Sequence, residues 1–175
     1  WAAEVVGPGR FGAHLICGLG ETEAQMLTLC QRIRDMGGHT HLFAFYPERG
    51  SLLQDRLPVP QSQWRRVQLA RHLIETGQAR AEEMAFAGDG RLLEYGVPPQ
   101  MVEAALDGGM AFRTSGCPGR DPAGASACNR PYGDSHPGDI RSFPFAPEHA
   151  DLAVVRRQLA GEALPTRTAD VERES

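Results

Sequence analysis

Two cysteines in the C-terminal half have the side chains most suited to metal binding. Cys117 and Cys128 lie in a stretch rich in glycine, proline and serine, and a loop of this composition lets several thiolates converge on one iron–sulfur cluster. Two thiolates are too few for a full ligand set, and their spacing matches no standard zinc motif. The other ligands would come from Ser115, His136 or residues outside this chain. A buried or disulfide-capable pair is the alternative, and both interpretations stay open.

A glycine turn near the N-terminus is the second feature that could do chemistry. The apolar residues 11–17 run into Gly18-x-Gly20, and Glu21 follows at the predicted start of a helix. Strand, glycine turn and helix in this order form a cofactor edge in α/β proteins. Glu21 would repel a pyrophosphate, because its carboxylate already stands at the positive end of the helix dipole. The turn therefore predicts a neutral or hydroxyl-bearing ligand that Glu21 can bind, unless Glu21 only caps its helix.

The residues that flank this turn predict a βαβ unit. A helix is expected over residues 22–36, where apolar residues recur at helical spacing and two glycines end the pattern. A second apolar strand over residues 41–46 is closed by Pro47. A strand, helix and strand with short links make a right-handed unit with parallel strands. Both strands then end at the same edge of the sheet, so we expect an α/β fold.

The remaining sequence predicts further helices and one hairpin. Asp89-Gly90 between apolar runs favours a hairpin turn. Helices are expected over residues 62–76, 99–106 and 148–159. Cys17 and Cys30 fall on the apolar side of the first strand and the first predicted helix, where a free cysteine acts as a small hydrophobic residue.

A motif around the glycine turn resembles a known family. His14-x-Ile16-x-Gly18-x-x-Glu21 is similar to the Gly-x-Ile-x-Gly-x-x-Glu motif of the radical S-adenosylmethionine (SAM) enzymes, with His14 in place of the first glycine. The version Gly-Leu-Gly-Glu-Thr is typical of the biotin synthase and lipoyl synthase branch. In that family the motif ends the fifth strand of a partial TIM barrel and supports the adenosine part of the cofactor. Residues 42–47 resemble the sixth strand, which contacts adenine.

This resemblance implies an architecture and a binding site. The chain would be the C-terminal part of a partial TIM barrel of radical SAM type, with a cysteine-containing C-terminal extension. Residues 1–80 would supply the last βα units, 81–160 the extension with hairpin, cysteine loop and terminal helix, and 161–175 a flexible tail. No catalytic residue is expected in the chain. The residues expected to bind SAM are His14, Ile16, Gly18, Gly20, Glu21, Phe45, Tyr46 and Pro47.

The family's cluster motif is the main departure from the resemblance. Radical SAM enzymes hold a [4Fe–4S] cluster with Cys-x3-Cys-x2-Cys, and the cysteines here have no such spacing. We therefore expect the chain to be the C-terminal half of a longer enzyme and to be inactive alone. Residues 113–132 resemble the C-terminal region of two-component lipoyl synthases. Arg113-Thr114-Ser115 is also similar to the Arg-Ser-Ser segment of ordinary lipoyl synthases, whose serine binds an auxiliary sulfur-donating cluster. The resemblance thus implies Cys117, Cys128 and Ser115 as auxiliary-cluster ligands.

The reaction implied by the resemblance is sulfur insertion. It comprises reductive cleavage of SAM, hydrogen abstraction from an unactivated carbon and transfer of sulfur. The implied partners are a lipoyl- or biotin-type substrate or carrier protein and a second radical SAM subunit. A non-catalytic α/β module that binds a metal or a partner is the alternative function.

Composition excludes two other classes of partner. The 175 residues carry a formal net charge of −4, whereas a nucleic-acid interface needs a clustered basic surface. No apolar run approaches the roughly 20 residues that cross a bilayer. Four cysteines in a chain of this size and class favour free thiols in a reducing compartment. The sequence therefore predicts a cytoplasmic protein.

Overall fold

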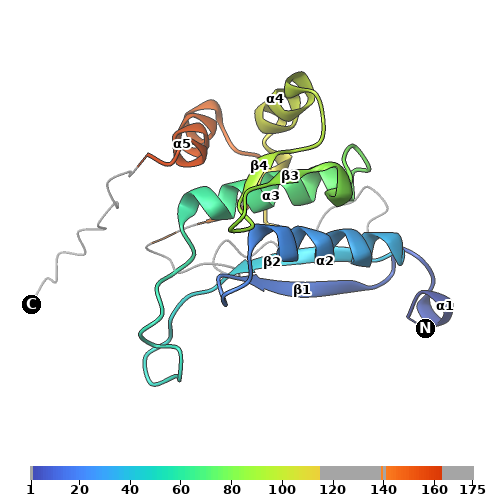
Figure 1. The fold of residues 1–175 in the computed structure, drawn as a ribbon, viewed down its shortest axis with the longest axis horizontal. Helices are drawn as coiled ribbons and strands as arrows, with labels where there is room; N and C mark the ends of the chain where they lie inside the picture. Colours follow the sequence, from blue (N-terminus) through green and yellow to red (C-terminus); the bar gives the residue numbers. More distant parts are fainter. Residues whose placement is uncertain (1, 115–138, 140, 163–175) are drawn as a thin grey trace, which may run out of the picture.

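The computed structural model describes residues 2–114, 139 and 141–162 (Figure 1). These residues form a mixed α/β fold with two two-stranded sheets. Neither of these sheets closes into a barrel. The elements along the chain are α1 (Ala2–Val6), β1 (Gly12–Cys17), α2 (Glu23–Asp35), β2 (His39–Ala44), α3 (Gln61–Glu75), η1 (Ala81–Glu83), β3 (Ala85–Phe86), β4 (Leu92–Glu94), α4 (Pro99–Gly108), η2 (Met110–Phe112) and α5 (His149–Leu159).

The predicted βαβ unit is confirmed. β1 and β2 pair in parallel, from Gly12 opposite His39 to Cys17 opposite Ala44, and α2 is the connection between them. Thr22 caps α2, because its hydroxyl accepts a hydrogen bond from the Gln25 amide while the Gln25 side chain accepts one from the Thr22 amide. The helix therefore begins one residue after the cap, and Glu21 stands outside it.

The second strand begins earlier than the sequence pattern predicted. It covers His39–Ala44 instead of residues 41–46, so Phe45 and Tyr46 follow the strand. Two hydrogen bonds stabilise the polar Thr40 in the strand: its amide and its hydroxyl both donate to Glu75 Oε1, at 2.7 and 2.6 Å. One further ladder bond, from the Phe45 amide to the Cys17 carbonyl at 2.8 Å, continues the pairing past Ala44.

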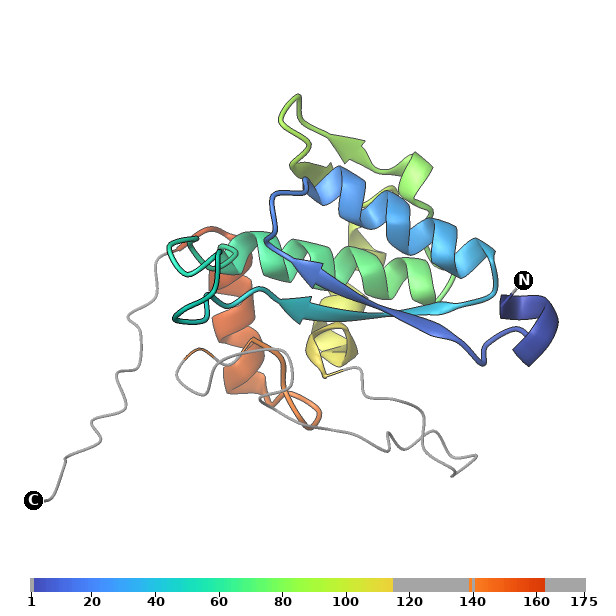
Figure 2. The ribbon, with the colours of Figure 1, turned by 90° about the horizontal axis from the view of Figure 1, so that it is seen from below.

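Helices α2 and α3 cover one face of the β1–β2 sheet, as Figure 1 and Figure 2 both show. Side chains alternate between the faces of a strand, and Cys17 and Leu42 point from the covered face into the core. Among the parts of the chain that the structure describes, no helix is long and apolar enough to cross a membrane.

Helices α4 and α5 lie on the other side of α3 from the sheet (Figure 1). The β3–β4 hairpin contacts the start of α2, where the Ala24 amide donates to the Gly90 carbonyl at 3.0 Å. Trp64 on α3 is fully buried and donates from Nε1 to the Arg141 carbonyl at 2.8 Å. Val155 on α5 and Phe112 on η2 are also fully buried. One hydrophobic cluster therefore includes residues of both segments that the sequence suggested, 1–80 and 81–160.

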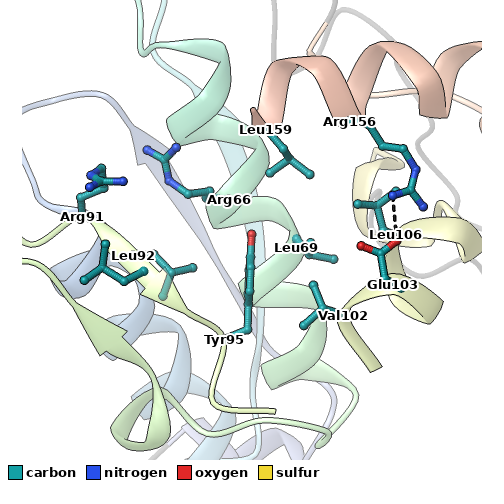
Figure 3. Close-up of a pocket in the computed structure, with 11 residues that line it drawn as sticks. Arg66, Leu69, Arg91, Leu92, Tyr95, Val102, Glu103, Leu106, Arg156 and Leu159 are labelled. Atoms are coloured by element: carbon teal, nitrogen blue, oxygen red, sulfur yellow. Dashed lines mark hydrogen bonds and ion pairs between the residues drawn. The ribbon is translucent and has the colours of Figure 1, made fainter. Parts of the chain in front are cut away.

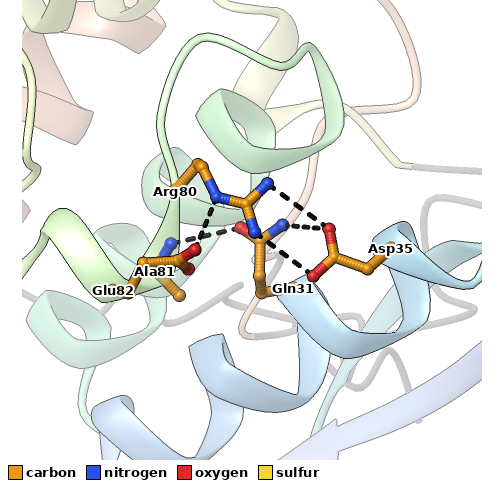
Figure 4. Close-up of polar contacts among 5 residues, drawn as sticks. All are labelled: Gln31, Asp35, Arg80, Ala81 and Glu82. Atoms are coloured by element: carbon orange, nitrogen blue, oxygen red, sulfur yellow. Dashed lines mark hydrogen bonds and ion pairs between the residues drawn. The ribbon is translucent and has the colours of Figure 1, made fainter.

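Polar contacts join η1 to α2 (Figure 4). Gln31 on α2 is buried, accepts a hydrogen bond from the Ala81 amide at 3.1 Å and donates to Asp35 at 2.8 Å. Arg80 donates to Glu82 at 2.5 Å and lies 3.4 Å from Asp35. Gln31 thus satisfies a buried backbone amide, while the exposed Arg80 pairs contribute little stability.

Candidate functional site

The carboxyl ends of β1 and β2 lie at one edge of the sheet, and the glycine turn leaves from this edge. Gly18 has φ +109°, a conformation that favours glycine. A Cβ at Gly18 would lie 3.0 Å from the Val59 Cβ and 3.3 Å from the Phe45 Cβ. Two of the predicted positions, Gly18 and Phe45, are therefore close together, and Gly18 is required by packing as well as by its backbone conformation.

The Glu21 carboxylate folds back onto the glycine turn. Its Oε1 accepts a hydrogen bond from the Gly18 amide at 2.6 Å, and its Oε2 accepts one from the Leu19 amide at 2.9 Å. Backbone amides of this kind are the donors with which a glycine-rich turn binds a phosphate. Because a carboxylate already occupies them, these two amides are not available to a phosphate.

Arg56 is a member of this edge that sequence reasoning missed. Its Nε donates to the Gly18 carbonyl at 2.8 Å. Its guanidinium also faces Gly20, because a Cβ there would lie 3.0 Å from Arg56 Nη2. Arg56 lies 38 residues beyond the carbonyl that it contacts. A local sequence pattern could not have predicted this contact.

The face of the sheet opposite the helices carries a row of imidazole, aromatic and aliphatic side chains. His14 is exposed and Ile16 is 47% exposed. In register with them on β2 are His41 and Phe43. The His14 ring centroid lies 5.1 Å from that of His41 and 5.0 Å from that of Phe43. We call the side chains of His14, Ile16, His41 and Phe43 the open-face row.

Sequence reasoning found half of the open-face row. His14 and Ile16 belong to the predicted site, whereas His41 and Phe43 were missed. Side chains two residues apart in a strand share a face, so the prediction of Phe45 could have been extended to Phe43 and His41. Beyond the strand, Phe45 and Pro47 are half-buried and Tyr46 is 41% exposed.

The described cysteines do not suit metal ligation. Cys17 and Cys30 are free and buried, as predicted for small core residues. Burial, reinforced by the nearby Glu21, raises the pKa of Cys17 well above its ordinary value. Burial raises the pKa of Cys30 to about 11. Both thiols are fully buried in the core, so neither is placed to meet a cluster at the surface.

The predicted auxiliary-cluster ligands Ser115, Cys117 and Cys128 lie outside the described residues. Within residues 2–114, 139 and 141–162, no group of three or more His, Cys, Asp or Glu side chains is arranged to hold a metal ion.

No protein-family model matches the chain, and neither a curated protein nor a solved structure matches it significantly. The likeness to the radical SAM enzymes therefore rests on the residues of the glycine turn, the second strand and the cysteine-containing segment.

Proposed function

We propose that this chain supplies the adenosyl-binding wall of a radical SAM enzyme of the biotin synthase and lipoyl synthase branch. The site is the carboxyl edge of β1–β2 together with the open-face row. One observation carries the proposal: the Glu21 carboxylate accepts hydrogen bonds from the Gly18 and Leu19 amides. The turn thus has the strand–glycine–helix form of a nucleoside site, but a carboxylate stands where a phosphate would bind.

The chemistry of the open-face row suits an uncharged purine. Ile16 and Phe43 offer aliphatic and aromatic surface, and the exposed His14 offers ring nitrogens that can form hydrogen bonds. Helices α2 and α3 cover the opposite face, and within the row His14 and Ile16 are exposed, Phe43 is half-buried and His41 is buried. In the assembled enzyme these side chains would hold the adenosyl group and exclude water from it.

The described residues fit the adenosyl group and do not fit an iron–sulfur cluster. When bound, a [4Fe–4S] cluster and SAM would supply the radical chemistry, with cluster ligands outside this chain. An auxiliary cluster on Cys117, Cys128 and Ser115 remains part of the proposal. Anaerobic iron–sulfur reconstitution of the chain tests it: the double variant Cys117→Ala/Cys128→Ala should bind less iron. An unchanged iron content would remove the auxiliary cluster.

Calorimetric titration with 5′-methylthioadenosine tests the adenosyl site without any cluster. We expect saturable binding, and weaker binding of AMP, because Glu21 repels its phosphate. Ile16→Glu should weaken the binding of methylthioadenosine by at least about tenfold. Val5→Glu is the matched control, since Val5 is 63% exposed on α1. Equal affinity for AMP, equal behaviour of the two variants, or no binding of methylthioadenosine would each contradict the proposal.

A partner-binding module is the second candidate function, and the loop between β2 and α3 favours it. Leu52 and Leu57 on this loop are fully exposed and 84% exposed, respectively. Grouped exposed leucines are typical of interaction surfaces. Concentration-dependent association measured by light scattering, and its loss in Leu52→Ser/Leu57→Ser, would support this function over the first if methylthioadenosine does not bind.

A further inference from the structure

A cavity of about 390 Å³ lies between α3, the hairpin β3–β4, α4 and α5 (Figure 3). None of its described lining residues belongs to the carboxyl edge of β1–β2, so it is a separate feature. Its volume falls in the range of small-molecule sites. Apolar side chains contributed by α3, β4, α4 and α5 form much of its wall: Leu69, Leu92, Val102, Leu106 and Leu159. We call this cavity the hairpin pocket.

Two of the three arginines that line the hairpin pocket are already neutralised. Arg66 contacts both carboxylate oxygens of Glu23, which is buried, with a shortest distance of 2.5 Å. Arg156 pairs with Glu103 and with Asp107, each at 2.7 Å. The carboxylate of Glu103 also lines the pocket, and Arg156 offsets its charge. Arg156 is shared by two carboxylates, so these five groups together carry a formal net charge of −1.

Arg91 and Tyr95 are different, because the described part of the chain offers no partner to either side chain. Arg91 is exposed at the rim of the pocket. Its hydrogen bond to Asp89 is donated by the backbone amide and leaves the guanidinium uninvolved. Tyr95 is half-buried, and Figure 3 shows its hydroxyl directed toward the middle of the pocket between Arg66 and Leu159. Burial raises the pKa of Tyr95 above its ordinary value, so the hydroxyl is a hydrogen-bond donor at neutral pH.

We propose that the hairpin pocket binds a small amphipathic carboxylate, with its apolar body against the leucines and the Tyr95 ring and its carboxylate at Arg91. Arg91 selects this class, because it is the arginine of the described lining residues whose side chain has no carboxylate partner in the described part of the chain. Arginine binds carboxylates with charge-assisted hydrogen bonds. An apolar wall with a few polar groups that fix orientation is the usual composition of a small-molecule site. This proposal does not depend on the adenosyl site.

Calorimetric titration of the full chain with 4-phenylbutyrate tests the proposal, with 4-phenylbutyramide as the uncharged probe of the same shape. We expect saturable binding of the acid and at least about fivefold weaker binding of the amide. 2-Naphthoate serves as a second acid of different shape. No saturable binding of either acid, or equal affinity for acid and amide, would overturn the proposal.

Variants locate the binding on the pocket. Arg91→Ala should weaken the binding of 4-phenylbutyrate by about tenfold. Arg49→Ala is the matched control, since it removes an exposed arginine of the loop between β2 and α3. Far-ultraviolet circular dichroism checks that each variant is folded. If Arg91→Ala binds as tightly as Arg49→Ala, the carboxylate is not held at this pocket.

Discussion

The two faces of the β1–β2 sheet are built from the same twelve residues and serve different purposes. On the covered face, Cys17 and Leu42 are buried beneath α2 and α3. On the other face, Ile16 is 47% exposed and His14 is exposed. The fold therefore depends on one set of alternate residues, whereas His14 and Ile16 of the other set stay exposed. Substitutions on the two faces should separate stability from binding.

The largest difference is expected between Leu42 and Ile16. Leu42→Ala leaves a cavity in the core and should lower the free energy of unfolding by about 3 kcal/mol. Ile16→Ala should change it by no more than about 0.5 kcal/mol, because the side chain is half exposed. Urea denaturation followed by circular dichroism measures both. Similar losses in the two variants would mean that the open face is packed in solution.

The carboxylates of Glu21 and Glu23, two residues apart, extend this comparison, and Glu23 should matter more for stability. Glu23 is buried on the covered side, where it pairs with Arg66 and accepts from the Leu92 amide at 2.9 Å. Glu23→Gln should cost about 2 kcal/mol in urea denaturation, because it leaves the Arg66 charge without its partner. The matched control is Glu103→Gln, which breaks an exposed pair with Arg156 and should cost less than about 1 kcal/mol. Equal costs would contradict the buried role of Glu23.

Glu21 lies at the proposed ligand-binding edge and should matter less for stability than Glu23. Glu21→Gln replaces a carboxylate that accepts from two amides with a group that has one acceptor oxygen. The expected loss in unfolding free energy is about 1 kcal/mol. The same variant should narrow the preference for methylthioadenosine over AMP, because the negative charge is gone. A loss as large as that of Glu23→Gln, with unchanged ligand preference, would assign Glu21 a purely structural role.

The smallest expected effect is a pH dependence from the covered face. The pKa of Cys30 rises from 9.0 to about 11 on folding, so above pH 9 the unfolded chain releases a proton that the folded chain retains. Stability from this group is therefore present below pH 9 and is lost as the pH rises toward 11. Between pH 8 and pH 10 the loss should be about 1 kcal/mol smaller in Cys30→Ala than in the natural chain. Urea denaturation at each pH measures the free energy of unfolding. The same pH dependence in Cys30→Ala and in the natural chain would contradict this prediction.

Local patterns predicted the βαβ unit because strand, helix and glycine signals are all contained in short segments. The later helices and the hairpin were predicted for the same reason. The start of β2 was missed, since His39 and Thr40 are polar and the bonds from Thr40 to Glu75 join it to a residue 35 positions away.

Contacts between distant segments could not be predicted in this way. The pairing of Arg56 with Gly18 and that of Arg66 with Glu23 join residues 38 and 43 positions apart. The hairpin pocket is likewise assembled from four elements that no single motif links. Of the candidate site, sequence patterns therefore pointed to the turn, the first strand and residues 45–47, and they missed His41, Phe43 and Arg56.

The most direct test of the adenosyl site is a nitrogen–proton NMR titration of the labelled chain with 5′-methylthioadenosine. The account predicts saturable shifts that are largest at the amides of Ile16, Gly18 and Tyr46, with little change at Leu92 and Val102 in the hairpin pocket. Shifts centred on the hairpin pocket, or no saturable shifts at the carboxyl edge of β1–β2, would contradict it.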